Sequence, residues 1–259
     1  MITAELYQEG ITYAEQNFLN ENANHLFVDK ALIRERFNLD GKKVLDFGCG
    51  MGGMSLWYAK NWRCQVHGVD IDRHHIAIAN DLRVKHGVKN VLFEVRNVLD
   101  APVEEKYDFI VLNDVAEHIS LPILKAIFRE LSRSLAFGGS IFVSYPPWKS
   151  PYASHVQHVV GIPWCQFLPQ KMLLRLIEKN NRIIVGEEES DLVAAYKGLN
   201  HLTHKKLMAV IEGSGLKVKF RKSHSIANRL PGLKNLNLRL FPLDYLITKE
   251  FLLLKKNGR

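Results

Sequence analysis

Short apolar segments alternate with longer amphipathic ones through the first 145 residues. The apolar segments have the length of strands that are buried on both faces, as they are in a parallel sheet. They span residues 43–47, 64–69, 91–95, 109–112 and 140–144. The segments between them carry apolar residues three and four positions apart, a spacing typical of helices. Strands that alternate with helices predict an α/β fold with a mostly parallel sheet.

The segments around these strands are expected to be helical. Residues 3–39 have mixed apolar and charged positions and little glycine or proline, which predicts helices before the first strand. Further helices are expected up to Lys60, over 73–86 and over 121–135, where residues 137–139 (Phe-Gly-Gly) follow as a stop.

The pattern changes after residue 145. A loop rich in proline, serine, histidine and aromatic residues runs to about Pro169. Short helices at 170–180 and 203–214 and strands at 216–220 and 246–254 follow. We interpret residues 145–200 as an insertion on the sheet rather than as a separate domain.

The composition is that of an ordinary globular protein, with 47% hydrophobic and 24% charged residues among 259. It excludes disordered, collagen-like and disulfide-framework chains. No apolar stretch approaches the length of a transmembrane helix, and the acidic residues within 1–20 predict no signal peptide. The three cysteines form no C-x-x-C pair, so we expect neither disulfides nor a cysteine zinc site, and a cytoplasmic location.

Charge is divided unevenly along the chain. Residues 1–140 carry 16 basic and 19 acidic side chains, whereas residues 141–259 carry 19 and 8, a net charge of +11. A basic half can attract nucleic acid, an acidic membrane or an anionic substrate. A lysine-rich, solvated surface would give the same composition.

A glycine-rich turn follows the first strand. Gly48, Gly50, Gly52 and Gly53 come directly after 43–47, and a predicted helix follows them. Glycines let the backbone approach a ligand at the N-terminus of the helix. The turn fits the dinucleotide pattern G-x-G-x-x-G, and an acidic residue ends the next strand, where it can accept a ribose. NAD and S-adenosylmethionine both carry that ribose, so these features leave both cofactors open.

Asp46 favours S-adenosylmethionine. It lies two residues before Gly48, where a dinucleotide would bring its pyrophosphate and a carboxylate would repel it. The ammonium and sulfonium of S-adenosylmethionine would instead be attracted. The alternative is that Asp46 only bonds backbone amides of its own turn.

At this point the chain resembles the class I S-adenosylmethionine-dependent methyltransferases, in particular bacterial enzymes that make small molecules. The first motif looks like Asp46-x-Gly48-x-Gly50-x-Gly52, and residues 69–71, 107–118 and 137–140 resemble later motifs in the same order. The resemblance covers about 41–145 well and 201–255 weakly. It implies a Rossmann-like sheet, mostly parallel with an antiparallel last strand, flanked by helices.

The resemblance also implies domain limits and cofactor contacts. Residues 1–40 would form a helical lid, and 41–259 the methyltransferase domain with its acceptor-pocket insertion at 145–200. Asp70 would bind the ribose, Ile71 the adenine, and Asn97 the adenine amino group in place of the usual Asp. The complete set of expected cofactor-binding residues is Asp46, Gly48, Gly50, Gly52, Asp70, Ile71, Asn97, Val98 and Asn113.

Methyl transfer needs an acceptor held in line with the methyl group, and a hydroxyl acceptor benefits from a general base. The candidate bases are His118, His155 and His158. The expected acceptor pocket comprises Tyr13, Tyr145, Trp148, Tyr152 and Trp164. Alternatively, the aromatic side chains pack on the edge of the sheet, and His118 supports the cofactor. The spacing of His155 and His158 also fits a metal pair, with Asp114 or Glu117 nearby, but we expect no metal site.

The leading hypothesis is therefore a methyltransferase that acts on a small-molecule acceptor, most readily at oxygen, in a biosynthetic pathway, with S-adenosylhomocysteine as product. An anionic acceptor would suit the basic half. An RNA methyltransferase is an alternative, although no RNA-binding module is recognisable. A lipid or quinone methyltransferase in peripheral membrane contact is another, because 226–246 mixes leucines with basic residues; Pro231 and Pro242 favour core packing instead. The last alternative is a cofactor-binding module without turnover.

Overall fold

Within the residues that the structure describes, seven strands form one sheet in the order β3-β2-β1-β4-β5-β7-β6. The structure is a computed structural model and describes residues 3–22, 26–179, 192–233, 236–238 and 241–256. The strands are β1 Lys43–Phe47, β2 Gln65–Asp70, β3 Val91–Val95, β4 Tyr107–Asn113, β5 Leu135–Tyr145, β6 Leu216–Ser225 and β7 Ile247–Lys256. β1 to β5 pair in parallel, and β7 is antiparallel to both of its neighbours, β5 and β6. The predicted Rossmann-like sheet with an antiparallel last strand is confirmed.

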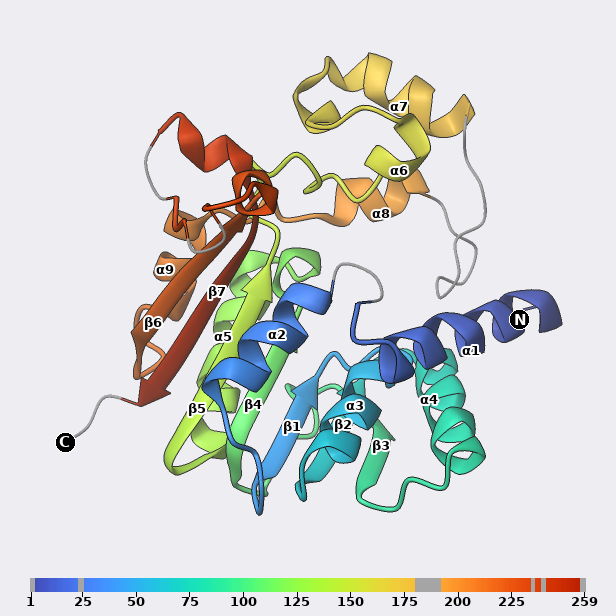
Figure 1. Cartoon of the computed structure of the whole chain (residues 1–259), viewed down its shortest axis with the longest axis vertical. Coiled ribbons are helices and arrows are strands. Elements are labelled where there is room, and N and C mark those ends of the chain that lie inside the picture. The colour runs from blue at the N-terminus through green and yellow to red at the C-terminus, as the bar shows by residue number, and fades with distance from the viewer. Residues whose placement is uncertain (1–2, 23–25, 180–191, 234–235, 239–240, 257–259) are drawn as a thin grey trace.

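Helices cover both faces of the sheet (Figure 1). One face carries α1 Ala4–Leu19, α2 Phe27–Arg36, α3 Gly53–Asn61 and α4 Arg73–Lys85, and the other carries α5 Leu121–Ser134 and α9 His204–Ile211. The remaining short elements are α6 Gln157–Val160, α7 Gln170–Lys179, α8 Leu192–Gly198 and the 3₁₀ turns η1 Ala116–His118, η2 Cys165–Phe167, η3 Ile226–Arg229 and η4 Leu243–Leu246. None of the helices described is both long and apolar enough to span a bilayer.

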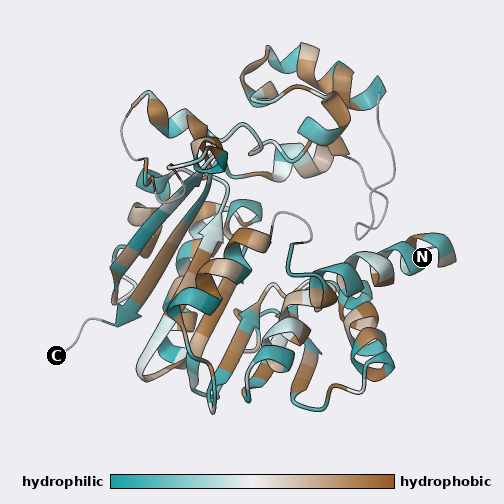
Figure 2. Cartoon of the chain, viewed as in Figure 1, coloured by the Kyte–Doolittle hydropathy of each residue, from teal (hydrophilic) through white to brown (hydrophobic). Residues whose placement is uncertain are grey.

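Two core layers follow from the alternation of side chains along the strands. In β1, Val44 faces the layer under α1–α4, and Leu45 faces the layer under α5 and α9. In β4, Val111 and Leu112 divide in the same way. Both layers are apolar, which explains the uninterrupted hydrophobic runs of the central strands, shown brown in Figure 2.

A third, smaller core lies inside the insertion. Val156, Cys165, Leu173, Ile177 and Tyr196 are buried together there, and they join α6, α7 and α8. Figure 1 shows these three helices grouped beyond the carboxyl ends of the parallel strands. The insertion therefore forms a small layer of its own above the edge of the sheet where α/β folds bind ligands.

Residues before the first strand pack on the sheet and also reach this edge. Ala14 and Phe18 of α1 and Ile33 of α2 are buried in the first core layer. α1 lies against α3 and α4. These helices pack on the flank of the sheet, and the expected role of residues 1–40 as a lid stays a prediction.

Two expectations about local structure are wrong. The stop at 137–139 does not end a helix, because α5 ends at Ser134 and β5 begins at Leu135, which pairs with Tyr107 of β4. Core packing of the leucines in 226–246 is wrong for Leu230, Leu233 and Leu236, which are exposed by 56%, 38% and 38% and lie around the turn at Pro231 and Gly232. Leu238 is buried, as expected, and Leu240 lies outside the described residues.

We expect Gly68→Ala in β2 to lower the free energy of unfolding by about 1–3 kcal/mol, the usual cost of overpacking a filled core. An added Cβ would come within 2.6 Å of the Phe93 ring and 3.0 Å of Cys49 Sγ. Urea denaturation followed by circular dichroism measures the change. Gly198→Ala is the control, since no atom lies within 4 Å of its added Cβ, and equal stabilities of the two variants would contradict the packing argument.

Candidate active site

The glycine turn after β1 adopts a backbone that other residues rarely adopt. Gly48, Gly50 and Gly52 have φ of 70°, 51° and 78°, in the left-handed region. A Cβ at Gly52 would meet Phe93 Cζ at 2.6 Å and Ala79 Cβ at 2.7 Å, so the turn lies against its neighbours without space for a side chain. α3 begins directly afterwards at Gly53, and its N-terminal amides face the turn.

Asp70 holds this turn at the carboxyl end of β2. Its carboxylate accepts hydrogen bonds from the backbone N–H of Gly50 at 2.8 Å and of Asp72 at 2.9 Å. The next residue, Ile71, is 76% exposed. A fixed carboxylate beside an exposed apolar side chain suits a ribose and the base attached to it.

Asp46 is buried under the turn, with only 2% of its surface exposed. Its Oδ2 accepts a hydrogen bond from Ser55 Oγ of α3 at 2.6 Å. The amides of Gly48 and Cys49 donate to the carbonyl of Val69 instead, so Asp46 does not serve to bond its own turn. Burial raises the pKa of Asp46 to about 6, and the charge of Asp70 adds to this effect.

The other expected cofactor residues bond within the protein. Asn97 donates to Asp100 and accepts the N–H of Leu99, so its amide closes its own turn. Val98 is buried in the second core layer. Asn113 donates to the Tyr58 hydroxyl at 2.8 Å. Their contact with a cofactor stays a prediction.

A cavity of about 640 Å³ lies at the carboxyl edge of the sheet. This volume suits a small-molecule ligand. The lining side chains come from α1 and α2, from the loops after β4 and β5, from α8 and from β7. Val115 lies against the glycine turn, because an added Cβ at Gly48 would be 2.7 Å from Val115 Cγ2. The preceding residue, Asp114, lines the cavity, so the turn and the cavity lie on either side of this short segment.

Five of the residues expected in the acceptor site line this cavity: Tyr13, His118, Tyr152, His155 and His158. Three others do not. Tyr145 is fully buried and donates to Glu250 at 3.0 Å, because the last residue of β5 points into the core. Trp148 stacks on His201 with ring centroids 3.8 Å apart. Trp164 donates to the backbone carbonyl of Tyr245 at 3.1 Å. These three side chains contact other parts of the fold instead of lining this cavity, and a role for them in binding an acceptor stays a prediction.

A buried ion cluster forms part of the cavity wall. Lys249 of β7 donates to Asp29 of α2 and, at 2.6 Å, to Asp114 after β4. Burial alone would lower the pKa of Lys249, but Asp114 and Asp29 together raise it above its ordinary value. Sequence analysis missed Lys249 and Asp29. The one local signal was a charged pair, Lys249-Glu250, inside an otherwise apolar strand.

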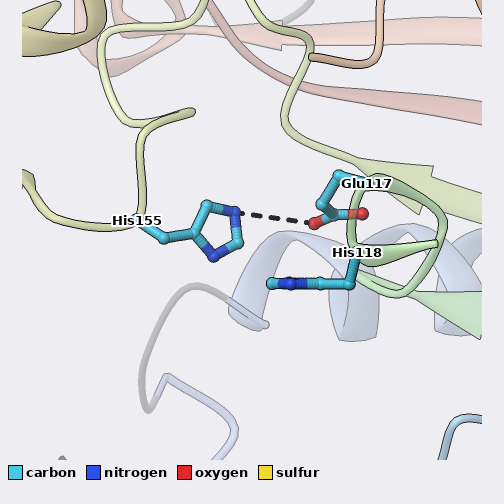
Figure 3. Close-up of side chains that lie close together, drawn as sticks. All are labelled: Glu117, His118 and His155. Carbon is cyan, nitrogen blue, oxygen red and sulfur yellow. Dashed lines mark ion pairs between the residues drawn. The ribbon is translucent and has the colours of Figure 1, made fainter. Parts of the chain in front are cut away.

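Glu117, His118 and His155 form a second cluster at the cavity (Figure 3). His155 Nε2 lies 3.8 Å from Glu117 Oε1, and the rings of His118 and His155 are 4.8 Å apart at 86°. Burial raises the pKa of the Glu117 carboxyl well above its ordinary range and lowers the pKa of His118. The sequence identified both histidines as candidate bases and considered Glu117 only as a possible neighbour of a metal pair formed by His155 and His158.

Comparison with known proteins identifies the class. A family model described as a methyltransferase domain matches residues 38–206, which is more than half of the chain, so the chain belongs to that family. A solved S-adenosylmethionine-dependent methyltransferase from Clostridium acetobutylicum has the same fold, with a TM-score of 0.60 at 12% identity over 97% of this chain and 99% of that one. The protein is thus a class I methyltransferase, and S-adenosylmethionine is its cofactor, as the sign of charge at Asp46 predicted.

Curated relatives match a smaller part of the chain. An ajmaline N-methyltransferase from Rauvolfia serpentina is 32% identical over 45% of this chain and 41% of its own length. A ubiquinone biosynthesis O-methyltransferase from Pseudomonas fluorescens (strain Pf0-1) is 33% identical over 43% of this chain and 47% of its own length. The chain therefore spans less than half of the length of these relatives.

We expect the affinity for S-adenosylmethionine to fall below pH 6, because Asp46 attracts the cations of the cofactor only when it is ionised. With a pKa of about 6, the carboxylate is charged at pH 7 and above, and only about one in ten remains charged at pH 5. Isothermal titration calorimetry should give a Kd about tenfold weaker at pH 5 than at pH 7.

The control for this pH dependence is Asp46→Asn, which should bind weakly with a Kd that hardly changes between pH 5 and pH 7. This variant distinguishes an effect of Asp46 on cofactor affinity from an effect of His75, whose Nδ1 lies 3.9 Å from Asp70 Oδ1. A wild-type Kd that stays constant over the same range would contradict the role given to Asp46.

Proposed function

We propose that this protein transfers the methyl group of S-adenosylmethionine to a hydroxyl oxygen of a small-molecule acceptor in a biosynthetic pathway. The observation that carries the proposal is the cavity of about 640 Å³, which is lined by four histidines, His118, His155, His158 and His224, and by Asp114, the residue before Val115. Val115 in turn lies against Gly48 of the glycine turn. The three free cysteines accord with a reducing compartment, and we propose the cytoplasm.

The cofactor fits the residues beside the cavity. We propose that Asp46 faces its cationic groups, that Asp70 accepts the ribose hydroxyls, and that Ile71 packs against the adenine. The turn formed by Gly48, Gly50 and Gly52 offers backbone N–H groups without side chains in the way. Asn97, Val98 and Asn113 would border the same site. Bound there, S-adenosylmethionine supplies the methyl group and a sulfur leaving group.

The cavity would hold the acceptor in line and accept its proton. The acceptor oxygen forms a bond to the methyl carbon as the carbon–sulfur bond breaks, and the electron pair of that bond stays on sulfur. The hydroxyl proton passes to an imidazole of His118, His155 or His158. Exclusion of water and alignment are the main contributions of the protein, and the base adds to them.

The lining of the cavity favours a flat acceptor with an anionic group. Tyr13 and Tyr152 offer aromatic faces, and Arg229 and His224 lie on the same lining. A guanidinium recognises a carboxylate or phosphate by paired hydrogen bonds. Oxygen as the acceptor atom agrees with the similarity to a ubiquinone biosynthesis O-methyltransferase, whereas the ajmaline relative acts on nitrogen.

A test of this function is methyl transfer from labelled S-adenosylmethionine to a panel of hydroxylated aromatic acids. We expect label in the acceptor, and a kcat about 100- to 10,000-fold lower when the catalytic histidine is replaced by Gln, with unchanged cofactor binding. His118→Gln, His155→Gln and His158→Gln are compared with His67→Gln, a histidine on β2 that is bonded to Tyr107 and Glu94.

Asp70→Ala serves as the negative control and should lose cofactor binding. Three histidine variants that all keep wild-type kcat would contradict base catalysis. An absence of transfer to oxygen, with transfer to amines, would move the proposal to nitrogen.

A second candidate function is methylation of a lipid or quinone at a membrane surface. It is favoured by a group of exposed apolar side chains that follow Arg229, a residue of η3 that lines the cavity. The group comprises Leu230, Leu233, Leu236, Phe241 and Leu243. Exposed leucines beside basic residues can insert into an anionic interface.

We expect the protein to float with vesicles of phosphatidylglycerol and phosphatidylcholine if this surface meets a membrane. The triple change Leu230→Ser, Leu233→Ser and Phe241→Ser should then abolish flotation. Phe137→Ser is the matched control, since Phe137 is fully exposed at the start of β5. Wild-type protein that stays at the bottom of the gradient would remove this candidate.

A further inference from the structure

Glu117, His118 and His155 bring one carboxylate and two imidazoles together at the cavity wall. The ligand atoms of these three side chains all lie within 4.8 Å of one another. Figure 3 shows both imidazoles directed toward the same space beside the Glu117 carboxylate. Glu117 and His118 belong to η1, and His155 comes from the insertion.

The carboxyl group of Glu117 is buried, and the His155 imidazole is an ion-pair partner of it among the described residues. Glu117 is 3% exposed, and neither of its oxygens has a hydrogen-bond partner among the residues described. His155 Nε2, at 3.8 Å, is too far away for a hydrogen bond. Buried carboxylates in proteins are ordinarily paired, hydrogen-bonded or bound to a metal. Both oxygens of Glu117 therefore have acceptor capacity that the described hydrogen-bond donors do not use, and a metal ion could use it.

The backbone at His155 turns its imidazole into the cluster at a cost. His155 has a φ of 57°, which is uncommon for a residue other than glycine. Such a conformation persists when the surrounding structure requires it, and it is concentrated at functional sites. The sequence had paired His155 with His158, whereas the structure places His118 beside His155 instead.

We propose that Glu117, His118 and His155 form a binding site for a first-row divalent cation, with zinc as the metal that fits best. Two imidazoles and one carboxylate are a known donor set for zinc, whereas Mg²⁺ prefers oxygen donors. Donor atoms about 2.0 Å from a tetrahedral zinc lie about 3.3 Å apart, so a separation of 3.8 Å closes by a few tenths of an ångström.

The remaining coordination position of the metal would face the cavity, because His118 and His155 both line it. The catalytic role of this metal rests on the proposed function: a hydroxyl acceptor bound to the metal would lose its proton more readily. His118 and His155 would then be ligands, and His158 would be the histidine left to receive that proton. Binding of the metal itself depends on neither the cofactor nor the acceptor.

The test uses the full chain without a histidine tag, freed of metal by dialysis against a chelator and titrated with ZnCl₂ in a calorimeter. We expect one zinc per chain with a micromolar or lower Kd, and much weaker binding of Mg²⁺. Glu117→Gln should raise the Kd for zinc more than about 100-fold, beyond the loss typical of residues that only orient a ligand. Visible absorption of added Co²⁺ reports the same tetrahedral site.

Glu94→Gln is the matched control, because Glu94 also contacts a histidine, His67, but lies outside the cavity. It should leave the Kd for zinc unchanged. His155→Ala gives a second test if Glu117→Gln does not fold, as judged by circular dichroism. Absence of zinc binding by the wild-type chain, or an unchanged Kd in the folded variants, would overturn the proposal.

The same samples are titrated with S-adenosylmethionine. Cofactor binding without zinc binding would overturn the metal site alone, whereas zinc binding without cofactor binding would overturn the proposed function alone.

Discussion

The ion pairs of the buried Lys249 ammonium are the interactions on which the wall of the cavity depends. The ammonium joins Asp29 and Asp114, so a helix before the sheet, the loop after β4 and the last strand meet at one point. Lys249 and Asp29 are separated by 220 positions in the sequence. Removing the Lys249 ammonium would take the cation away from both carboxylates at once, which is strongly destabilising. The cavity is thus assembled around an ion cluster, while the sheet beneath it is held by apolar packing.

The sheet could be predicted because each strand is encoded by the hydrophobic pattern of its own short segment. The segments 43–47 and 91–95 coincide with β1 and β3, since an uninterrupted apolar run has few alternatives to a buried strand. Errors arose where contacts between segments far apart in the sequence override the structure that the local hydrophobic pattern favours. Residues 135–139 resemble the end of a helix, but pairing of Leu135 with Tyr107 draws them into β5. The leucines after Ser225 resemble core residues, but their exposure depends on where the chain turns.

In the candidate site, too, the residues set by local sequence could be predicted, and those set by distant contacts could not. The glycine turn and Asp70 lie within two consecutive βα units, so spacing alone placed them together, and the bond from Gly50 to Asp70 agrees. The lining of the cavity depends on the direction in which each side chain points, and the spacing of residues in the sequence does not determine that direction. Tyr145 was placed in the pocket by its position after β5, yet it points into the core toward Glu250. Glu117 was considered beside the pair His155 and His158, but its proximity to His155 could not be read from spacing, because His155 comes from another segment.

The glycine turn and the wall of the cavity are expected to differ in how far relatives share them. The curated relatives match 43–45% of the chain at 32–33% identity, whereas a solved methyltransferase matches nearly all of it in fold at 12% identity. A cofactor common to a family constrains the turn that binds it, because backbone geometry and the sign of charge admit few substitutions. The wall of the cavity, assembled from the N-terminal helices, the insertion and the last strand, would be constrained only by the ligand of the cavity. We therefore expect the residues around Lys249 and Glu117 to vary more among relatives than those around Gly48.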